Sequence, residues 1–242
     1  MGRTSSLFAI CLAVVGLSSV AAAQLPDWTV AVVGRGSFTT SSKVFFNPDA
    51  SSEILRGEYA ELNHVYGLGL ELRWRPFDGG FFISLGSEYL SSTTGRTQVV
   101  RSMFGYLRVP GEDGYRVVPV ELGGNIYVPL GTNAVRLAVG GGIGGYVTQR
   151  ILSVSGVKAE DVTTPVSFGI HVRTTFEYRV ADRLYVTGEL RFRDPEAVTT
   201  SRFVTQEGTY RGTTFQLPQN ELRSRINVDG MNLSIGMLVE LF

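Results

Sequence analysis

Apolar and polar side chains alternate along much of this chain, most clearly in residues 61–75, "ELNHVYGLGLELRWR". Leu62, Leu68 and Leu70 fall on one face with the other apolar residues, and the opposite face carries charged residues and glycines. Successive side chains of a strand point to opposite sides, so this pattern predicts a long strand between two different environments. Seven further strands are predicted in the same way, at residues 28–36, 81–90, 116–130, 135–146, 164–180, 184–193 and 226–242. No window shows a sustained helical period.

The connections between these strands are alternately short and long. Tight turns are expected at residues 76–80, 131–134 and 181–183, and long polar loops at 37–60, 91–115, 147–163 and 194–225. All short turns then lie at one end of the sheet, and an even number of strands brings both termini to that end. The pattern predicts an all-β fold, an eight-stranded antiparallel up-and-down transmembrane β-barrel. Within the loops we expect hairpins at residues 96–109 and around Glu207 and Gly208.

The composition of the two faces indicates which of them meets lipid. A soluble barrel of the lipocalin kind would turn its apolar face inward, and this alternative stays open. The polar face, however, mixes charged side chains with many glycines, a mixture that suits a crowded interior better than a solvated surface. The glycines are Gly67, Gly69, Gly86, Gly123, Gly140, Gly142 and Gly144. We therefore expect the leucines to contact lipid and the charges to face inward.

Aromatic residues fall at two levels of the predicted barrel, as in the girdles that form where amphipathic rings meet lipid headgroups. The expected turn-end girdle is Trp28, Trp74, Phe81, Phe176 and Tyr178, and the expected loop-end girdle is Tyr66, Tyr89 and Phe192.

The inward residues closest to the middle of the predicted barrel are mostly charged. They are Glu71, Glu88, Glu121, His171, Arg173, Glu189 and Arg191. Single buried charges are costly, so these groups should pair across a lumen that is only wide enough for side chains. We expect a charge network that plugs the barrel. The alternative is a proton-linked or ion-conducting gate. A plug should give little current in planar bilayers, and Arg173→Ala or Glu121→Ala should increase the current if these groups block the path.

The N-terminus predicts export. Residues 1–23 combine Arg3, an apolar run from Leu7 to Leu17 and a small-residue site before Gln24, as in a cleaved secretory signal peptide. The barrel domain is then residues 24–242. The only cysteine of the chain, Cys11, lies in the signal peptide, so a large core or a surrounding membrane must hold the mature chain together without disulfides.

Charge and motifs exclude several functions. The chain has 22 basic and 22 acidic residues, a balance that indicates no nucleic-acid partner. "GGGIGG" at residues 140–145 contains GxGxxG, but the β-branched segment after it is not the helix that a dinucleotide site requires. Neither His64 nor His171 begins the H-x-S pair of lipid A deacylases, and two histidines are few for a metal site. We expect no enzyme activity, no cofactor and no metal.

The segment "YRVVPVELGGNIYVPLGTNAVRLAVGGGIGGYVTQR" resembles the central hairpin of small bacterial outer-membrane β-barrel proteins of the OmpW, OmpA-like and OmpX-like group. With the signal peptide and the terminal Phe242, the resemblance covers essentially the whole chain. It implies that the barrel-assembly machinery recognises the last strand through Phe242. Here Phe242 is out of step with the apolar face of that strand, unless a bulge restores the register.

The expected function is that of an integral outer-membrane barrel with a structural role or with loops that bind an extracellular ligand. Its expected surroundings are the lipids and lipopolysaccharide of the outer membrane. The alternative that the resemblance implies is a narrow OmpW-like channel for small hydrophobic molecules, and fold alone does not decide between the two.

Overall fold

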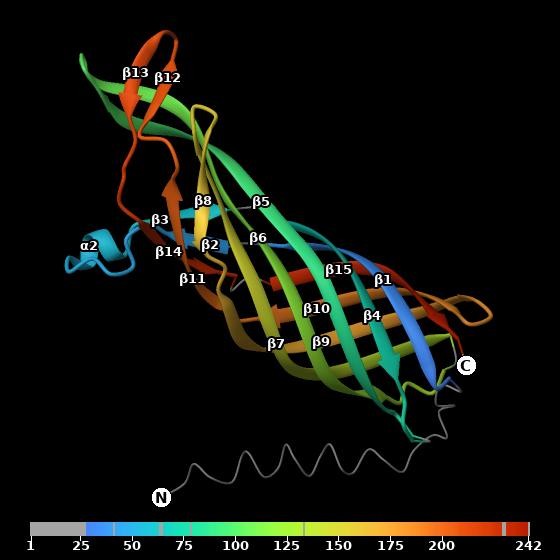
Figure 1. The fold of residues 1–242 in the computed structure, drawn as a ribbon. Coiled ribbons are helices and arrows are strands. Elements are labelled where there is room, and N and C mark those ends of the chain that lie inside the picture. The colour runs from blue at the N-terminus through green and yellow to red at the C-terminus, as the bar shows by residue number, and fades with distance from the viewer. Residues whose placement is uncertain are drawn as a thin grey trace, which may run out of the picture.

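Eight antiparallel strands form a closed barrel, in which each strand pairs with both of its neighbours in the ring (Figure 1). The structure is a computed structural model that describes residues 28–40, 42–62, 65–77, 79–132, 134–228 and 231–241. In ring order, the barrel strands are β1 (Val30–Thr39), β4 (Val65–Trp74), β5 (Phe81–Ser102), β6 (Gly105–Val128), β7 (Val135–Val154), β9 (Val166–Ala181), β10 (Leu184–Arg193) and β15 (Met231–Glu240). The ring closes where β15 pairs with β1, from Ala31↔Glu240 to Thr39↔Asn232. This confirms the expected all-β, eight-stranded antiparallel architecture.

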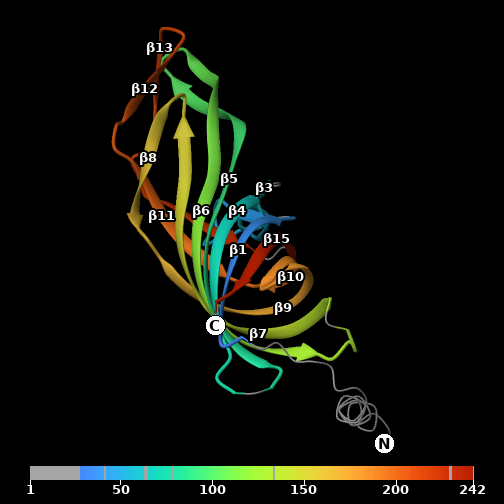
Figure 2. The ribbon, with the colours of Figure 1, turned by 90° about the vertical axis from the view of Figure 1, so that its right-hand side faces the viewer.

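Above one end of the barrel, β5, β6 and β7 continue into a second layer of strands that we call the upper sheet (Figure 2). One short helix, α2 (Glu53–Arg56), accompanies it. The other strands of the upper sheet are β2 (Ser42–Phe45), β3 (Tyr59–Leu62), β8 (Val157–Thr163), β11 (Glu196–Phe203), β12 (Glu207–Tyr210), β13 (Thr213–Gln216) and β14 (Leu222–Asn227). Their pairing runs β7, β8, β11, β14, β2, β3, while β12 and β13 form a hairpin that attaches to β5.

No helix in the described part of the chain has the length and apolar character needed to cross a membrane.

The predicted alternation of connections is confirmed. Short turns join β4 to β5, β6 to β7 and β9 to β10 at the end of the barrel opposite the upper sheet. The described termini also meet at that end, where the Leu241 amide donates to the Val30 carbonyl across 2.9 Å. Both expected hairpins are present: residues 96–109 form the tip of the β5–β6 hairpin, which turns at Met103 and Phe104, and β12 pairs with β13.

Strands β5, β6 and β7 extend beyond their predicted bounds into the upper sheet, and two other predicted strands are each divided. Residues 61–75 are not one strand: β3 ends at Leu62, β4 begins at Val65, and Leu62 is buried inside instead of lying on the outer face. The last predicted strand likewise divides into β14, in the upper sheet, and β15, in the barrel wall. In both places the chain leaves the barrel wall to fold over the barrel mouth, and alternation alone does not register this change of direction.

The exposure of side chains alternates along every wall strand with the polarity expected for a lipid-facing barrel. Outward residues such as Leu68, Leu70, Phe168 and Ile235 are between 67% and 83% exposed. Inward positions of the same strands hold buried arginine, glutamate, serine and threonine. This distribution is the reverse of that in a soluble barrel, whose outer face is polar.

Trp28 corrects the expected turn-end girdle. It is 1% exposed and packs edge-on against Phe82, with 5.8 Å between the ring centroids. Strict alternation would place Trp28 outside with Val30, but β1 begins only at Val30 and the bend at Thr29 turns the indole inward.

Candidate functional site

The middle of the barrel holds ten buried charged side chains, which we call the ionic layer. It consists of Arg35, Glu71, Arg73, Glu88, Glu121, Arg173, Glu177, Glu189, Arg191 and Arg193, none more than 7% exposed. Five guanidinium groups and five carboxylates balance in formal charge. Inside a space of low dielectric constant, such groups are tolerated only when they are paired and hydrogen-bonded.

Glu71 is the centre of one half of this layer. Arg35 Nη1 donates to its Oε2 and Arg73 Nε to its Oε1, each across 2.7 Å. Arg173 bonds the same carboxylate, and Arg73 also pairs with Glu177. Glu71 therefore accepts hydrogen bonds from guanidinium groups of three different strands.

Arg173 joins this centre to neutral polar groups. Its Nε donates to Asn125 Oδ1 and its Nη2 to Ser84 Oγ, both across 2.7 Å. A planar guanidinium with five N–H donors suits this fixed arrangement, which the single charge of a lysine could not reproduce.

The other half is centred on Glu121. Arg193 Nε lies 2.9 Å from its Oε1, the Tyr146 hydroxyl donates to it across 3.0 Å, and Arg191 also pairs with it. Arg193 and Arg191 continue the layer by pairing with Glu88 and Glu189, respectively. The two halves meet where Arg173 Nη1 lies 3.4 Å from a Glu189 oxygen.

The structure brings together all seven residues expected in the lumen. His171 is 3% exposed, and its Nε2 points at the small Gly123. The sequence prediction omitted Arg35, Arg73, Arg193 and Glu177, and so counted only two arginines against four carboxylates. These four residues share the inward face that alternation identifies, but distance from the turns placed them outside the middle of the barrel.

Two apolar layers enclose the ionic layer from below and above. The lower apolar layer, at the turn end, is Trp28, Ala31, Val33, Phe82, Tyr127, Ala138, Tyr185 and Leu238. The upper apolar layer, at the mouth, is Val44, Leu62, Val65, Leu90, Tyr115, Val117, Tyr146, Ile226 and Val228. Strands β2, β3 and β14 of the upper sheet supply several members of the upper apolar layer. The mouth of the barrel is therefore closed partly by side chains that do not come from the wall strands.

Inward glycines make room for the ionic layer. A Cβ atom on Gly86 would lie 3.4 Å from Arg35 Nη2 and 3.5 Å from Glu71 Oε2, and one on Gly144 would lie 2.9 Å from both Glu121 Cγ and the Tyr146 hydroxyl. This agrees with the interpretation of "GGGIGG" as a strand whose small residues admit larger neighbours.

A leucine at Gly144 should therefore displace part of the ionic layer. We expect Gly144→Leu to lower the free energy of unfolding by about 1–3 kcal/mol, the usual effect of overpacking an interior. Urea unfolding in lipid vesicles would measure it. Gly188→Leu is the matched control, because a Cβ atom there meets nothing within 4 Å, and an equal loss in both variants would contradict the crowding of the interior at Gly144.

The remaining residues of the expected girdles all point outward from the wall. Trp74, Phe81, Phe176 and Tyr178 at the turn-end level and Tyr66, Tyr89 and Phe192 at the loop-end level are between 41% and 62% exposed. Their contact with headgroups stays a prediction. Phe242, the expected assembly signal, lies outside the described residues, as do His64 and the expected signal peptide.

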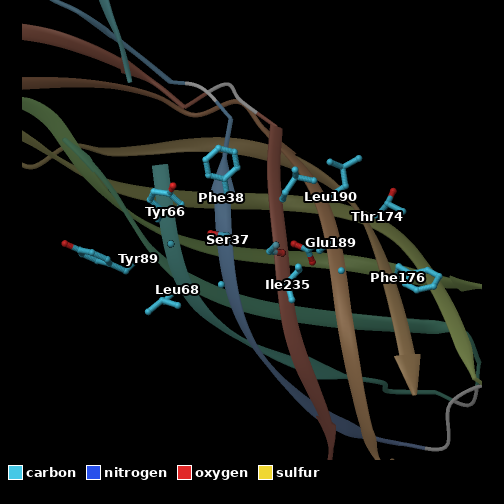
Figure 3. Close-up of a pocket in the computed structure, with 15 residues that line it drawn as sticks. Ser37, Phe38, Tyr66, Leu68, Tyr89, Thr174, Phe176, Glu189, Leu190 and Ile235 are labelled. Atoms are coloured by element: carbon cyan, nitrogen blue, oxygen red, sulfur yellow. The ribbon is translucent and has the colours of Figure 1, made fainter. Parts of the chain in front are cut away.

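A groove of about 1060 Å³ runs over the outer wall across β4, β1, β15, β10 and β9 (Figure 3). Large and small side chains alternate across these strands in one row of the register, Leu68, Gly36, Ile235, Gly188 and Phe176. The glycines form the low points of the groove. Phe38 and Tyr66, with ring centroids 5.6 Å apart, border it toward the upper sheet.

The pairing of β5 with β6 is interrupted at one point. It passes from Ser87↔Val120 directly to Leu90↔Val117, which leaves Glu88 and Tyr89 of β5 and Val118 and Pro119 of β6 out of this pairing. Proline has no amide hydrogen to donate to a neighbouring strand, so the ladder is weakest here. Among the described residues, no group of three or more His, Cys, Asp or Glu side chains is placed to hold a metal ion.

The sequence matches no protein-family model and none of the curated proteins. Solved structures do resemble the fold. The outer membrane protein OprG from Pseudomonas aeruginosa is 14% identical with a TM-score of 0.54, over 89% of this chain and 96% of that one. Neisserial surface protein A is 11% identical over 88% and 97% of the two chains, with a TM-score of 0.46. Ail, the attachment invasion locus protein of Yersinia pestis, is 8% identical over 87% and 99%, with a TM-score of 0.40. The similarity to OprG shows that the chain has the fold of an outer-membrane β-barrel.

Proposed function

We propose that the chain is an integral outer-membrane β-barrel with a sealed lumen, whose role is to strengthen the membrane or to hold a rigid binding surface outside the cell. Outer-membrane lipids and lipopolysaccharide would surround its wall, and the barrel-assembly machinery would insert it. We expect the protein to bind a partner or to support the membrane, and not to catalyse a reaction.

The exposed apolar band of the wall supports the proposed location in a membrane. Outward leucine, isoleucine, valine and phenylalanine cover it from Trp74, at the turn end, to Tyr66, at the loop end. Monomeric soluble proteins rarely expose contiguous apolar patches of more than a few hundred Å². Closure of the ring also satisfies the backbone hydrogen bonds where no water is available. These features disfavour the soluble, lipocalin-like alternative.

The observation that carries the sealed lumen is the stacking of three layers inside the barrel. An ion would have to pass the upper apolar layer, a neutralised ionic layer and the lower apolar layer. In eight-stranded barrels side chains fill the interior, and here they come from both the wall and the upper sheet. A rigid, filled barrel that carries strands outside the membrane is better suited to holding a binding surface than to conducting ions.

Conductance in planar bilayers tests the seal. We expect no single-channel steps from the wild-type protein. Arg173→Ala should also give none, because both apolar layers remain in place when one guanidinium is removed. A trimeric porin in the same bilayers is the positive control. Discrete steps from the wild type would contradict the sealed lumen, and steps from Arg173→Ala alone would show that the ionic layer is a gate.

A second candidate, a lateral path for small hydrophobic molecules, is favoured by the outer groove and by the break in pairing at Pro119. If molecules leave the wall at this break, Pro119→Val should restore a hydrogen-bond donor and reduce uptake of a small apolar dye into proteoliposomes. Val120→Ala, on the outer face of the same strand, is the control. Equal uptake by all three proteins would exclude the path.

A further inference from the structure

The upper sheet has a free edge along β5. In the barrel wall, β4 pairs with β5 as far as Tyr66↔Ser91. In the upper sheet, β13 pairs with β5 only at Arg101 and Ser102. Between these points, residues 92–100 of β5 pair with β6 on one side and, among the described residues, with no strand on the other. In an antiparallel strand, the N–H and C=O groups of successive residues point to opposite sides. This edge therefore presents unpaired backbone donors and acceptors to which another strand could bind.

A cavity of about 750 Å³ opens along this edge. Six consecutive residues of β5, 96–101, line it together with buried residues of β6 and β7 such as Asp113 and Leu152. The opposite rim is formed by Phe46, Asn47 and Glu58 and by the segment 216–218, through which the chain leaves β13. The two rims meet at Arg96, whose guanidinium carbon lies 4.4 Å from the centroid of the Phe46 ring.

The charge on this edge is positive. Arg96 and Arg101 are exposed, neither has an ion pair among the described residues, and no acidic residue lies between positions 92 and 102. Arg150 lines the same cavity from inside. It is 9% exposed and pairs with Asp113 across 3.1 Å, while its Nε is buried with no hydrogen-bond partner among the described residues.

We propose that this edge binds an extended acidic peptide segment of a partner protein, which adds as a strand along the free edge of β5 and displaces the Arg96 guanidinium from the Phe46 ring. The inference rests on the proposed function, since it names the partner of the surface held outside the cell. Backbone pairing supplies affinity in this mode of recognition, and side chains on alternate faces supply specificity. Arg96 and Arg101 are five residues apart, hence on opposite faces of β5. The segment should carry two acidic residues five apart, with β-branched residues opposite Val99 and Val100.

A second copy of this chain fits the edge poorly. Two β5 edges pairing antiparallel would bring four arginines together without an acidic partner, and like charges across strands repel. Charges of one sign on an edge strand are a known protection against such self-pairing.

Fluorescence anisotropy with the full mature chain, folded in detergent, tests the inference. The probe is a labelled twelve-residue peptide of threonine and valine with glutamates at positions 4 and 9, and the control peptide has lysines there. We expect saturable binding of the acidic peptide only. Arg96→Glu with Arg101→Glu should weaken it at least tenfold, whereas Arg202→Glu, at an exposed site on β11, should leave it unchanged.

Amide hydrogen exchange separates strand addition from simple charge attraction. Bound peptide should slow exchange in residues 92–100, and methylation of alternate peptide nitrogens should abolish both the protection and the binding. Binding without protection, equal binding of the methylated peptide, or protection only elsewhere would overturn the inference, as would binding of a sulfated polysaccharide in place of the peptide. Since binding is measured on folded protein in detergent, its failure leaves the bilayer conductance result, and with it the proposed sealed barrel, unaffected.

Discussion

Replacing Glu71 by alanine is expected to lower the free energy of unfolding by about 3–5 kcal/mol, the cost of removing one member of a buried ionic group. The carboxylate accepts from Arg35 and Arg73 at 2.7 Å and from Arg173, so its loss leaves three buried guanidinium groups short of a partner. Urea unfolding in lipid vesicles, followed by tryptophan fluorescence, would measure the change.

The control for Glu71→Ala is Glu112→Ala, because Glu112 is exposed on β6 and has no ion pair among the described residues. We expect less than about 0.5 kcal/mol from it, as for most exposed substitutions. A loss below about 1 kcal/mol at Glu71 would place that carboxylate among solvated surface pairs, and the ionic layer would then be open to water.

Replacing Leu70 by arginine is expected to lower the free energy of unfolding in vesicles by about 2–4 kcal/mol, the usual effect of a cation on the lipid-facing side near the bilayer midplane. Leu70 lies midway between Trp74 and Tyr66 on β4 and is 67% exposed, so the cause is the apolar surroundings and not lost packing.

Val204→Arg is the matched control for Leu70→Arg. Val204 is 64% exposed, nearly as much as Leu70, but it lies beyond β11 in the upper sheet. If water covers both sites, the two variants should be equally stable, and the proposed contact of the wall with lipid would be contradicted.

Alternation and turns predicted the barrel wall well. Each inward and outward position of β4, β9 and β10 follows from a period of two, and the short turns determine which ends of the strands lie together. Inward glycines were a further signal, since they mark where long side chains such as Arg35 and Glu121 need room.

The composition of the ionic layer could not be predicted fully, because the strands of a barrel are staggered as well as tilted. Arg73 on β4 and Glu177 on β9 pair across the lumen although both lie close to the turn end in sequence. Counting residues from each turn assumes that all turns lie at the same height along the barrel axis. That assumption excluded Arg73 and Glu177 from the predicted ionic layer. Pairing across the lumen depends on the register of the whole ring.

The upper sheet was the least predictable part. Its strands bury one face around a small apolar cluster that includes Val100, Val109 and Phe215. Many buried positions of this face are serine, threonine or glycine, so the sequence lacks the apolar–polar alternation of a wall strand, and these segments were expected to be loops with hairpins. Trp28 was misplaced for a local reason, because one bend at Thr29 reverses the side to which the indole points.

The central claim, that apolar lipid covers the wall while the interior is sealed, is tested most directly by the two tryptophans of the chain. Trp74 is 49% exposed on the outer face, and Trp28 is 1% exposed inside. In vesicles of brominated lipid, Trp28→Phe, which keeps only Trp74, should lose most of its fluorescence to quenching, and Trp74→Phe should keep its fluorescence. Strong quenching of Trp74 by aqueous iodide with none by the lipid would contradict the account.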